Sequence, residues 1–132
     1  MMLIDESICT GCRTCEFACA LQQKKSFHYD FSLIRIRKNK AEEGFFLVTV
    51  CRHCPSAPCL AACPVEAIGK DSQSGIVTID PQKCTGCGQC VDACPWQAPV
   101  LSSNDGFANI CDLCKGDPLC VKFCQPGALR LL

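Results

Sequence analysis

The stretch from Cys84 to Pro95 decides the fold of this chain, and it reads Cys-Thr-Gly-Cys-Gly-Gln-Cys-Val-Asp-Ala-Cys-Pro. Three cysteines recur at every third position, and a fourth follows one helical turn after the third. A loop this tight needs small residues such as Gly86 and Gly88, because glycine adopts backbone angles that other residues cannot. The stretch therefore predicts a tight loop wrapped around a metal-bound group, followed by a short turn of helix.

The same pattern occurs four times in the 132 residues, so the chain contains an internal repeat. The first group keeps the spacing of the third, while the second and fourth groups lengthen only the middle gap. All 16 cysteines are used, in the groups Cys9, Cys12, Cys15, Cys19; Cys51, Cys54, Cys59, Cys63; Cys84, Cys87, Cys90, Cys94; and Cys111, Cys114, Cys120, Cys124.

This spacing is that of bacterial iron–sulfur ferredoxins, in which the fourth cysteine of a group ligates the other cluster of a pair. Four groups predict four 4Fe-4S clusters in two pairs. Structural zinc is the alternative, but zinc sites use two separated Cys-x2-Cys pairs and have no need of a third cysteine at the same interval. Eight disulfides are the other alternative, and a reducing cytoplasm disfavours them.

Composition limits the partners and the location. Lys+Arg and Asp+Glu number 13 each, so no basic excess indicates nucleic acid. The chain starts without a signal-type leader, and it has no apolar run near the roughly 20 residues of a membrane-spanning helix. We therefore expect a cytoplasmic protein without membrane insertion.

Between the cysteine groups the sequence predicts short strands, short helices and many loops, an α+β fold. Alternation in Leu33 to Lys38, a polar turn near Lys40 to Gly44 and the strand Phe45 to Val50 predict an inserted β-hairpin. No segment shows the periodicity of a long helix. The remaining expectations are a helical turn at Val65 to Ile68, a strand at Ile76 to Ile79, and a turn at Ser102 to Gly106 flanked by Leu101 and Phe107 to Ile110.

The second group, from Cys51-Arg52-His53-Cys54 to Cys63-Pro64, resembles the second motif of the four-cluster electron-transfer subunits of molybdenum and tungsten oxidoreductases. Formate dehydrogenase and dimethyl sulfoxide reductase have subunits of this family. The resemblance covers nearly the whole chain, including Cys111-Asp112-Leu113-Cys114. It implies a relay subunit with no catalytic residues of its own, working with a larger catalytic subunit that holds a tungsten or molybdenum pterin cofactor, and with a further redox subunit or ferredoxin.

The resemblance also implies a nested arrangement, although spacing alone leaves two tandem ferredoxins open. One compact unit, 1–132, would contain an outer ferredoxin-like pair (1–22 with 107–132), an inner pair (51–100) and the hairpin insert (23–50). The implied ligands are Cys9, Cys12, Cys15 and Cys124 for cluster 1; Cys51, Cys54, Cys59 and Cys94 for cluster 2; Cys84, Cys87, Cys90 and Cys63 for cluster 3; and Cys111, Cys114, Cys120 and Cys19 for cluster 4.

Two runs near the end, Lys115 to Pro118 and Pro126 to Leu129, resemble small subunits of tungsten aldehyde oxidoreductases and similar anaerobic enzymes. The relay hypothesis has two alternatives. One is a free-standing soluble polyferredoxin, and the other, of a different class, is a structural zinc-binding interaction module. Zinc protein would be colourless and redox-silent, which separates it from both iron–sulfur interpretations.

A few residues outside the cysteine groups have competing interpretations. His53 is either an iron ligand or a residue that contacts the cluster ligands or the loop, and the complete cysteine groups favour a contact without ligation. Trp96 either guides electrons or shields a cluster from water. Shielding is favoured, because it is the more common role of a buried aromatic ring. We expect the hairpin from Leu33 to Val50 to dock on a larger subunit or to cover the clusters, with its basic residues binding an acidic partner or only keeping the strand solvated: Arg35, Arg37, Lys38 and Lys40.

Overall fold

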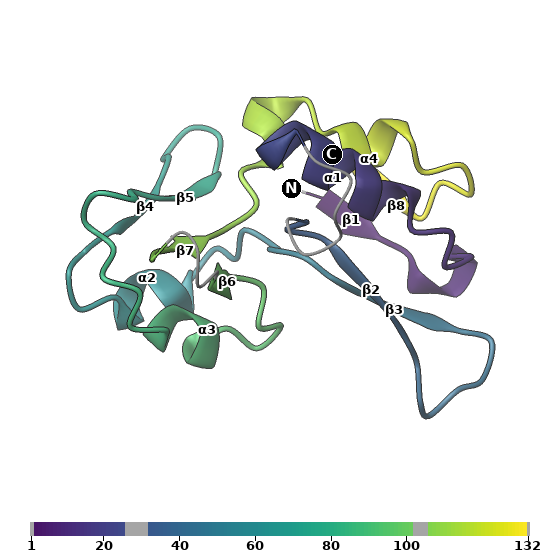
Figure 1. Ribbon diagram of the computed structural model, residues 1–132, viewed down its shortest axis with the longest axis horizontal. Helices are drawn as coiled ribbons and strands as arrows, with labels where there is room; N and C mark the ends of the chain where they lie inside the picture. The colour runs from purple at the N-terminus through teal and green to yellow at the C-terminus, as the bar shows by residue number, and fades with distance from the viewer. Residues whose placement is uncertain (1, 26–31, 102–105, 132) are drawn as a thin grey trace. The chain divides into compact units, whose positions relative to one another are not determined.

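The structure is a computed structural model that describes residues 2–25, 32–101 and 106–131. The chain divides into two compact units, of which the first combines Met1–Thr49 with Leu113–Leu132 and the second is Val50–Asp112. Short helices, two-stranded sheets and loops build each unit (Figure 1). The observed fold is therefore α+β, as the sequence predicted.

The first unit joins the two ends of the chain. Strand β1 (Met2–Ile4) pairs antiparallel with β8 (Leu129–Leu131), with Leu3 opposite Arg130. Helix α1 (Thr14–Lys24) packs against α4 (Leu119–Lys122). The short 3-10 helices η1 (Glu6–Ile8) and η3 (Leu113–Gly116) complete the unit.

The predicted hairpin is present in the first unit as β2 (Arg35–Lys38) and β3 (Phe46–Thr49), which pair antiparallel (Figure 1). Its alternation has the predicted sense. Ile34 and Ile36 are buried, whereas on the other face Arg35 is half-buried and Arg37 is exposed. One face of the hairpin therefore packs inward and the other meets solvent.

The second unit repeats the same plan. Helix α2 (Pro58–Ala62) packs against α3 (Gln89–Ala93), and β4 (Ile68–Lys70) pairs antiparallel with β5 (Val77–Ile79). A further pair, β6 (Val100–Leu101) with β7 (Ala108–Asn109), lies on either side of the predicted turn. Residues 102–105 of that turn lie outside the described residues.

Two local predictions were wrong. The helical turn expected at Val65 to Ile68 is absent, because Ile68 already begins β4 and pairs with Ile79. Helix α1 has 11 residues and runs well past the single turn expected at Cys15 to Cys19. Its buried face consists of cysteine, glutamate and alanine, so it carries little of the large apolar periodicity by which helices are recognised. Among the described residues, no helix is both long and apolar enough to cross a membrane.

Candidate iron–sulfur sites

The first unit contains a cavity lined by Cys9, Cys12, Cys15 and Cys124, which we call the Cys124 cavity. Cys9 and Cys12 lie on the loop before α1, Cys15 lies in the first turn of α1, and Cys124 follows α4. The packing of α1 against α4 thus brings together the first three cysteines of one group and the last cysteine of another. These four are the residues expected for cluster 1.

The hairpin forms one wall of the Cys124 cavity, because Ile36 and Val48 both line it. Next to the cavity, the ring of Phe46 covers Gly11, and a Cβ placed on Gly11 would lie 2.4 Å from the Phe46 Cζ atom. The backbone N–H of Ile36 also donates a hydrogen bond to the buried carboxylate of Glu16 on α1. The hairpin is therefore fixed to the cysteine loop at several points, which sequence reasoning did not find.

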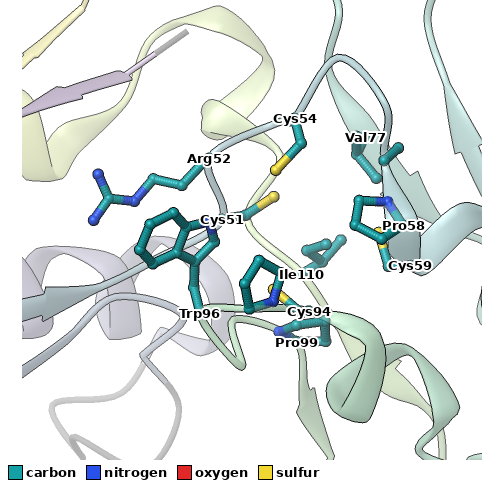
Figure 2. Close-up of a pocket in the computed structure, with 12 residues that line it drawn as sticks. Cys51, Arg52, Cys54, Pro58, Cys59, Val77, Cys94, Trp96, Pro99 and Ile110 are labelled. Carbon is teal, nitrogen blue, oxygen red and sulfur yellow. The ribbon is translucent and has the colours of Figure 1, made fainter.

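The second unit contains a cavity lined by Cys51, Cys54, Cys59 and Cys94, which we call the Trp96 cavity (Figure 2). Cys59 lies on α2, and Cys94 caps the C-terminus of α3. The other walls are apolar or aromatic: Ala57, Pro58, Val77, Pro95, Trp96, Pro99 and Ile110, together with the side chain of Arg52. Its four cysteines are those expected for cluster 2.

Arg52 and Trp96 stand together at one side of this cavity (Figure 2). The guanidinium carbon of Arg52 lies 4.7 Å from the centroid of the Trp96 ring, within the range of a cation–π interaction. Trp96 is 46% exposed to solvent. The indole therefore forms part of the cavity wall and part of the protein surface.

A second cavity in the same unit is lined by Cys63, Cys84, Cys87 and Cys90, which we call the Cys63 cavity. Its loop needs glycine at Gly86, where φ is +76° and a Cβ would lie 2.8 Å from the carbonyl oxygen of Gly106. The four cysteines are those expected for cluster 3. Its other walls are Val65, Ala67, Ile68, Ile79, Thr85, Gly88 and Ala108.

The cysteines expected for cluster 4 are divided between the two units. Cys19, Cys114 and Cys120 belong to the first unit, whereas Cys111 belongs to the second. Burial, and to a smaller extent the neighbouring Cys19 and Cys114, raise the pKa of Cys120 to about 12. These three thiols are thus close enough to interact. That they bind one cluster together with Cys111 stays a prediction.

Backbone amides point at several of the sulfur atoms. The N–H of Ala67 donates to Cys63 Sγ at 3.3 Å, and the N–H of Ala98 donates to Cys94 Sγ at 3.5 Å. Each donor comes four residues after the last cysteine of its group. Burial by itself raises the pKa of Cys63, but backbone N–H groups of the following residues outweigh it and the pKa is lowered. Such amides stabilise negative charge on sulfur.

The more deeply buried thiols behave in the opposite way. Burial raises the pKa of Cys15 to about 12 and that of Cys51 to about 11. A buried thiolate needs a compensating positive charge, and iron bound in the cavity supplies one. Sulfur-only donors, amide groups aimed at sulfur and apolar walls all fit a 4Fe-4S cluster. Within the described ranges, no three His, Cys, Asp or Glu side chains are placed to hold a single metal ion.

His53 makes a contact with the backbone of a neighbouring strand, in line with the expected role without ligation. It is 4% exposed, and its Nδ1 accepts a hydrogen bond from the backbone N–H of Val77 at 3.0 Å. Burial lowers the pKa of its imidazole. Of the basic residues on the hairpin, Arg37, Lys38 and Lys40 are exposed and Arg35 is half-buried.

Among known protein families, the 4Fe-4S dicluster domain matches residues 42–132 of this chain. The matched region contains the second, third and fourth cysteine groups, while the first group precedes it. This match covers more than half of the chain and agrees in cofactor with the cysteine spacing.

Two similar proteins are subunits of oxidoreductases by name, and one of them is named as an electron-transfer subunit. The polyferredoxin-like subunit of the aliphatic sulfonate oxidoreductase of Pyrococcus furiosus is 39% identical over 124 residues, which span 94% of this chain and 70% of that protein. The thiosulfate reductase electron transfer subunit PhsB of Salmonella typhi is 33% identical over 142 residues, with 98% and 73% covered. Neither name describes a catalytic subunit.

Among solved structures, the active-site complex BamBC of benzoyl coenzyme A reductase bound to benzoyl-CoA contains a chain of similar fold. The TM-score is 0.54 at 23% sequence identity, and the match covers 98% of this chain and 76% of that one. At this identity the likeness concerns the fold.

Proposed function

We propose, since this chain belongs to the 4Fe-4S dicluster domain family, that it relays single electrons through four 4Fe-4S clusters between a separate catalytic subunit and another redox partner. The observation that carries the proposal is the composition of three cavities. Each is lined by three cysteines of one group and the last cysteine of a different group. That combination is the ligand exchange of paired ferredoxin clusters.

The proposed ligands follow the nested arrangement. The Cys124 cavity would hold cluster 1, the Trp96 cavity cluster 2 and the Cys63 cavity cluster 3, each through the four cysteines that line it. Support for nesting over two tandem ferredoxins comes from the helix pairs, α1 with α4 and α2 with α3. Cluster 4 would use Cys111, Cys114, Cys120 and Cys19.

When bound, each cluster supplies one-electron redox chemistry. The chain holds the cluster through thiolates and keeps water from it. In the Cys124 cavity the hairpin residues Ile36 and Val48 exclude water, and in the Trp96 cavity Val77, Ile110 and the indole do so. The sulfur atoms of Cys63, Cys84 and Cys94 accept hydrogen bonds from backbone N–H groups. These donors stabilise negative charge on sulfur and thereby tune the potentials.

Metal and sulfide analysis of anaerobically prepared protein tests the cofactor. Four clusters require about 16 iron and about 16 acid-labile sulfide per chain, with brown colour. About eight of each would support only two clusters, in line with the dicluster description. Protein with zinc and no sulfide would replace the relay with the structural zinc module.

The partner is the second part of the proposal. Similar proteins serve a sulfonate oxidoreductase and a thiosulfate reductase, which supports an oxidoreductase complex. Within that class we propose a catalytic subunit with a tungsten or molybdenum pterin cofactor, of the aldehyde or formate oxidoreductase type, in the cytoplasm. Anaerobic purification through a tag on this chain, followed by identification of the bound subunits and elemental analysis for both metals, tests it. Recovery of the iron-loaded chain alone would favour the free-standing polyferredoxin.

A further inference from the structure

The imidazole of His53 is held in one orientation inside the second unit. In sequence, His53 lies between two cysteines that line the Trp96 cavity, Cys51 and Cys54, and its backbone N–H donates to Cys51 Sγ at 3.4 Å. Its Nδ1 accepts the N–H of Val77 at 3.0 Å. A ring nitrogen that accepts carries no proton, so the proton of the neutral ring is on Nε2.

That Nε2–H is buried and has no hydrogen-bond acceptor among the described residues. Native proteins rarely leave such a donor unsatisfied, because burial removes the water that would otherwise accept from it. The side chain is only 4% exposed, so bulk solvent does not supply the acceptor. The Nε2–H of His53 is therefore available to donate a hydrogen bond to a group that binds next to it.

Charged residues and cysteines of two groups surround this donor in the second unit. Lys70, a cation, lies near the ring, and its Nζ donates to the carbonyl oxygen of Cys54 at 2.6 Å. Asp112, which follows Cys111, also interacts electrostatically with the ring. His53 thus has cysteines of the second group next to it in sequence and interacts with the residue after the first cysteine of the fourth group. Cys51 and Cys54, on either side of His53 in sequence, line the Trp96 cavity, so a cluster bound there would bring sulfur acceptors near the ring.

We propose that His53 Nε2–H donates a hydrogen bond to a sulfur atom of an iron–sulfur cluster and raises the reduction potential of that cluster. The inference rests on the proposed function, because it requires the clusters to be bound. Reduction adds negative charge to the cluster, and a hydrogen bond to sulfur stabilises the reduced form more than the oxidised form. His53 acts here as a tuning residue and is not an iron ligand.

Two substitutions separate this role from the structural one. In His53→Asn, the side-chain oxygen can accept from the Val77 N–H as Nδ1 does, but nothing replaces Nε2–H. In His53→Gln, the longer side chain can place an amide N–H near the Nε2 position. We expect both variants to keep the wild-type iron content. The midpoint potential of one cluster should shift downward in His53→Asn and less in His53→Gln, while the other clusters stay unchanged.

The measurement is an EPR-monitored redox titration of the anaerobic chain, with iron and sulfide determined on the same samples. Unchanged potentials in an iron-replete His53→Asn protein would overturn the inference. Loss of one cluster's iron from both variants would identify His53 as an iron ligand and overturn it too. A wild-type protein without clusters would instead be the failure of the proposed function.

Wild-type protein provides a measurement that does not depend on the variants. The chain has two histidines, His28 and His53, so labelling their rings alone with 15N gives few nitrogen signals. We expect a weak 15N coupling to a reduced cluster in pulsed EPR, retained in His28→Gln. A strong coupling, typical of direct ligation, or no coupling at all would each contradict the hydrogen bond.

Discussion

Arg52 lies across the indole of Trp96, with its guanidinium carbon 4.7 Å from the ring centroid. Both side chains line the Trp96 cavity, and the indole is 46% exposed. A contact of this kind at an exposed site contributes about 0.5–1 kcal/mol. The contact also fixes the position of the indole, so that the ring lies between the proposed cluster and water.

Removing the indole should expose one cluster to oxygen and water. We predict that Trp96→Ala keeps its iron under anaerobic conditions but loses one cluster several-fold faster in air than the wild type. The measurement is the decay of visible absorbance, in which about a quarter of the signal should become fast if four clusters are bound. Trp96→Phe, which keeps an aromatic ring, is the matched control and should decay at nearly the wild-type rate. Equal decay in all three proteins would show that the ring does not shield a cluster.

The last cysteine of a group should matter to a different group. In the nested arrangement, Cys124→Ala destabilises the cluster on Cys9, Cys12 and Cys15. We predict that these three thiols become reactive toward iodoacetamide in the anaerobic variant and that iron falls by up to a quarter. Peptide mass spectrometry locates the alkylated cysteines.

Cys19→Ala is the companion variant, and it should expose Cys111, Cys114 and Cys120 in place of the first group. Tandem ferredoxins predict another outcome for both substitutions. In that arrangement Cys124→Ala would expose Cys84, Cys87 and Cys90, and Cys19→Ala would expose Cys51, Cys54 and Cys59. The alkylation pattern therefore decides between the two arrangements.

Features that depend on local sequence were predictable. The interval between the third and fourth cysteines corresponds to one helical turn, and each such pair lies on or directly after a helix, as Cys59 and Cys63 do at α2. The alternation of Ile34 and Ile36 with charged residues likewise predicted the hairpin and the face that it buries.

Features that depend on contacts distant in sequence were not predictable from spacing. Nothing in the intervals brings Cys124 to Cys9, and that set came from a family resemblance. The packing of the Phe46 ring over Gly11 is indicated in the sequence only indirectly, by a glycine in a tight loop. Helix α1 extends past Cys19 because Ala18 and Ala20 pack inward, and alanines give a weak periodic pattern. A short apolar run such as Val65 to Ile68 does not distinguish a helical turn from a strand.

Because of the contact between Phe46 and Gly11, substitution of Gly11 and of Gly44 by alanine should lower stability by different amounts. Gly11 and Gly44 both have positive φ, +72° and +86°, so alanine is strained at either position by about 1–2 kcal/mol. At Gly44 no heavy atom lies within 4 Å of a built Cβ, whereas at Gly11 the Phe46 ring is in the way. We predict that Gly11→Ala lowers the stability of the loaded protein by more than Gly44→Ala does.

Anaerobic denaturant titration, followed by loss of visible absorbance, measures the difference. The double variant Gly11→Ala/Phe46→Ala removes the obstructing ring together with its packing, so it tests whether the two sites interact. We expect the combined loss to be smaller than the sum of the two single losses. Equal effects of Gly11→Ala and Gly44→Ala would mean that the ring moves away without cost.

The β2–β3 hairpin covers the Cys124 cavity with the face that carries Ile36 and Val48, and the opposite face presents Arg37 and Leu47 to solvent. Lys38 and Phe45, at the turn end of the hairpin, are exposed as well. Phe45 and Leu47 are 42% and 39% exposed, and exposed apolar side chains beside charges are typical of docking surfaces. We predict that Arg37→Glu/Lys38→Glu, or shortening of the turn from Lys38 to Gly44, weakens association with the catalytic subunit at least several-fold while iron content and colour are preserved.

The matched control is Lys83→Glu, the same kind of charge reversal at an exposed residue of the second unit. Affinity measured between the tagged chain and its co-purified partner, at two salt concentrations, separates docking from long-range steering, since steering weakens as salt screens the charges. If the hairpin variants and Lys83→Glu bind the partner equally well, the hairpin serves only to cover the cavity, and the docking surface lies elsewhere on the chain.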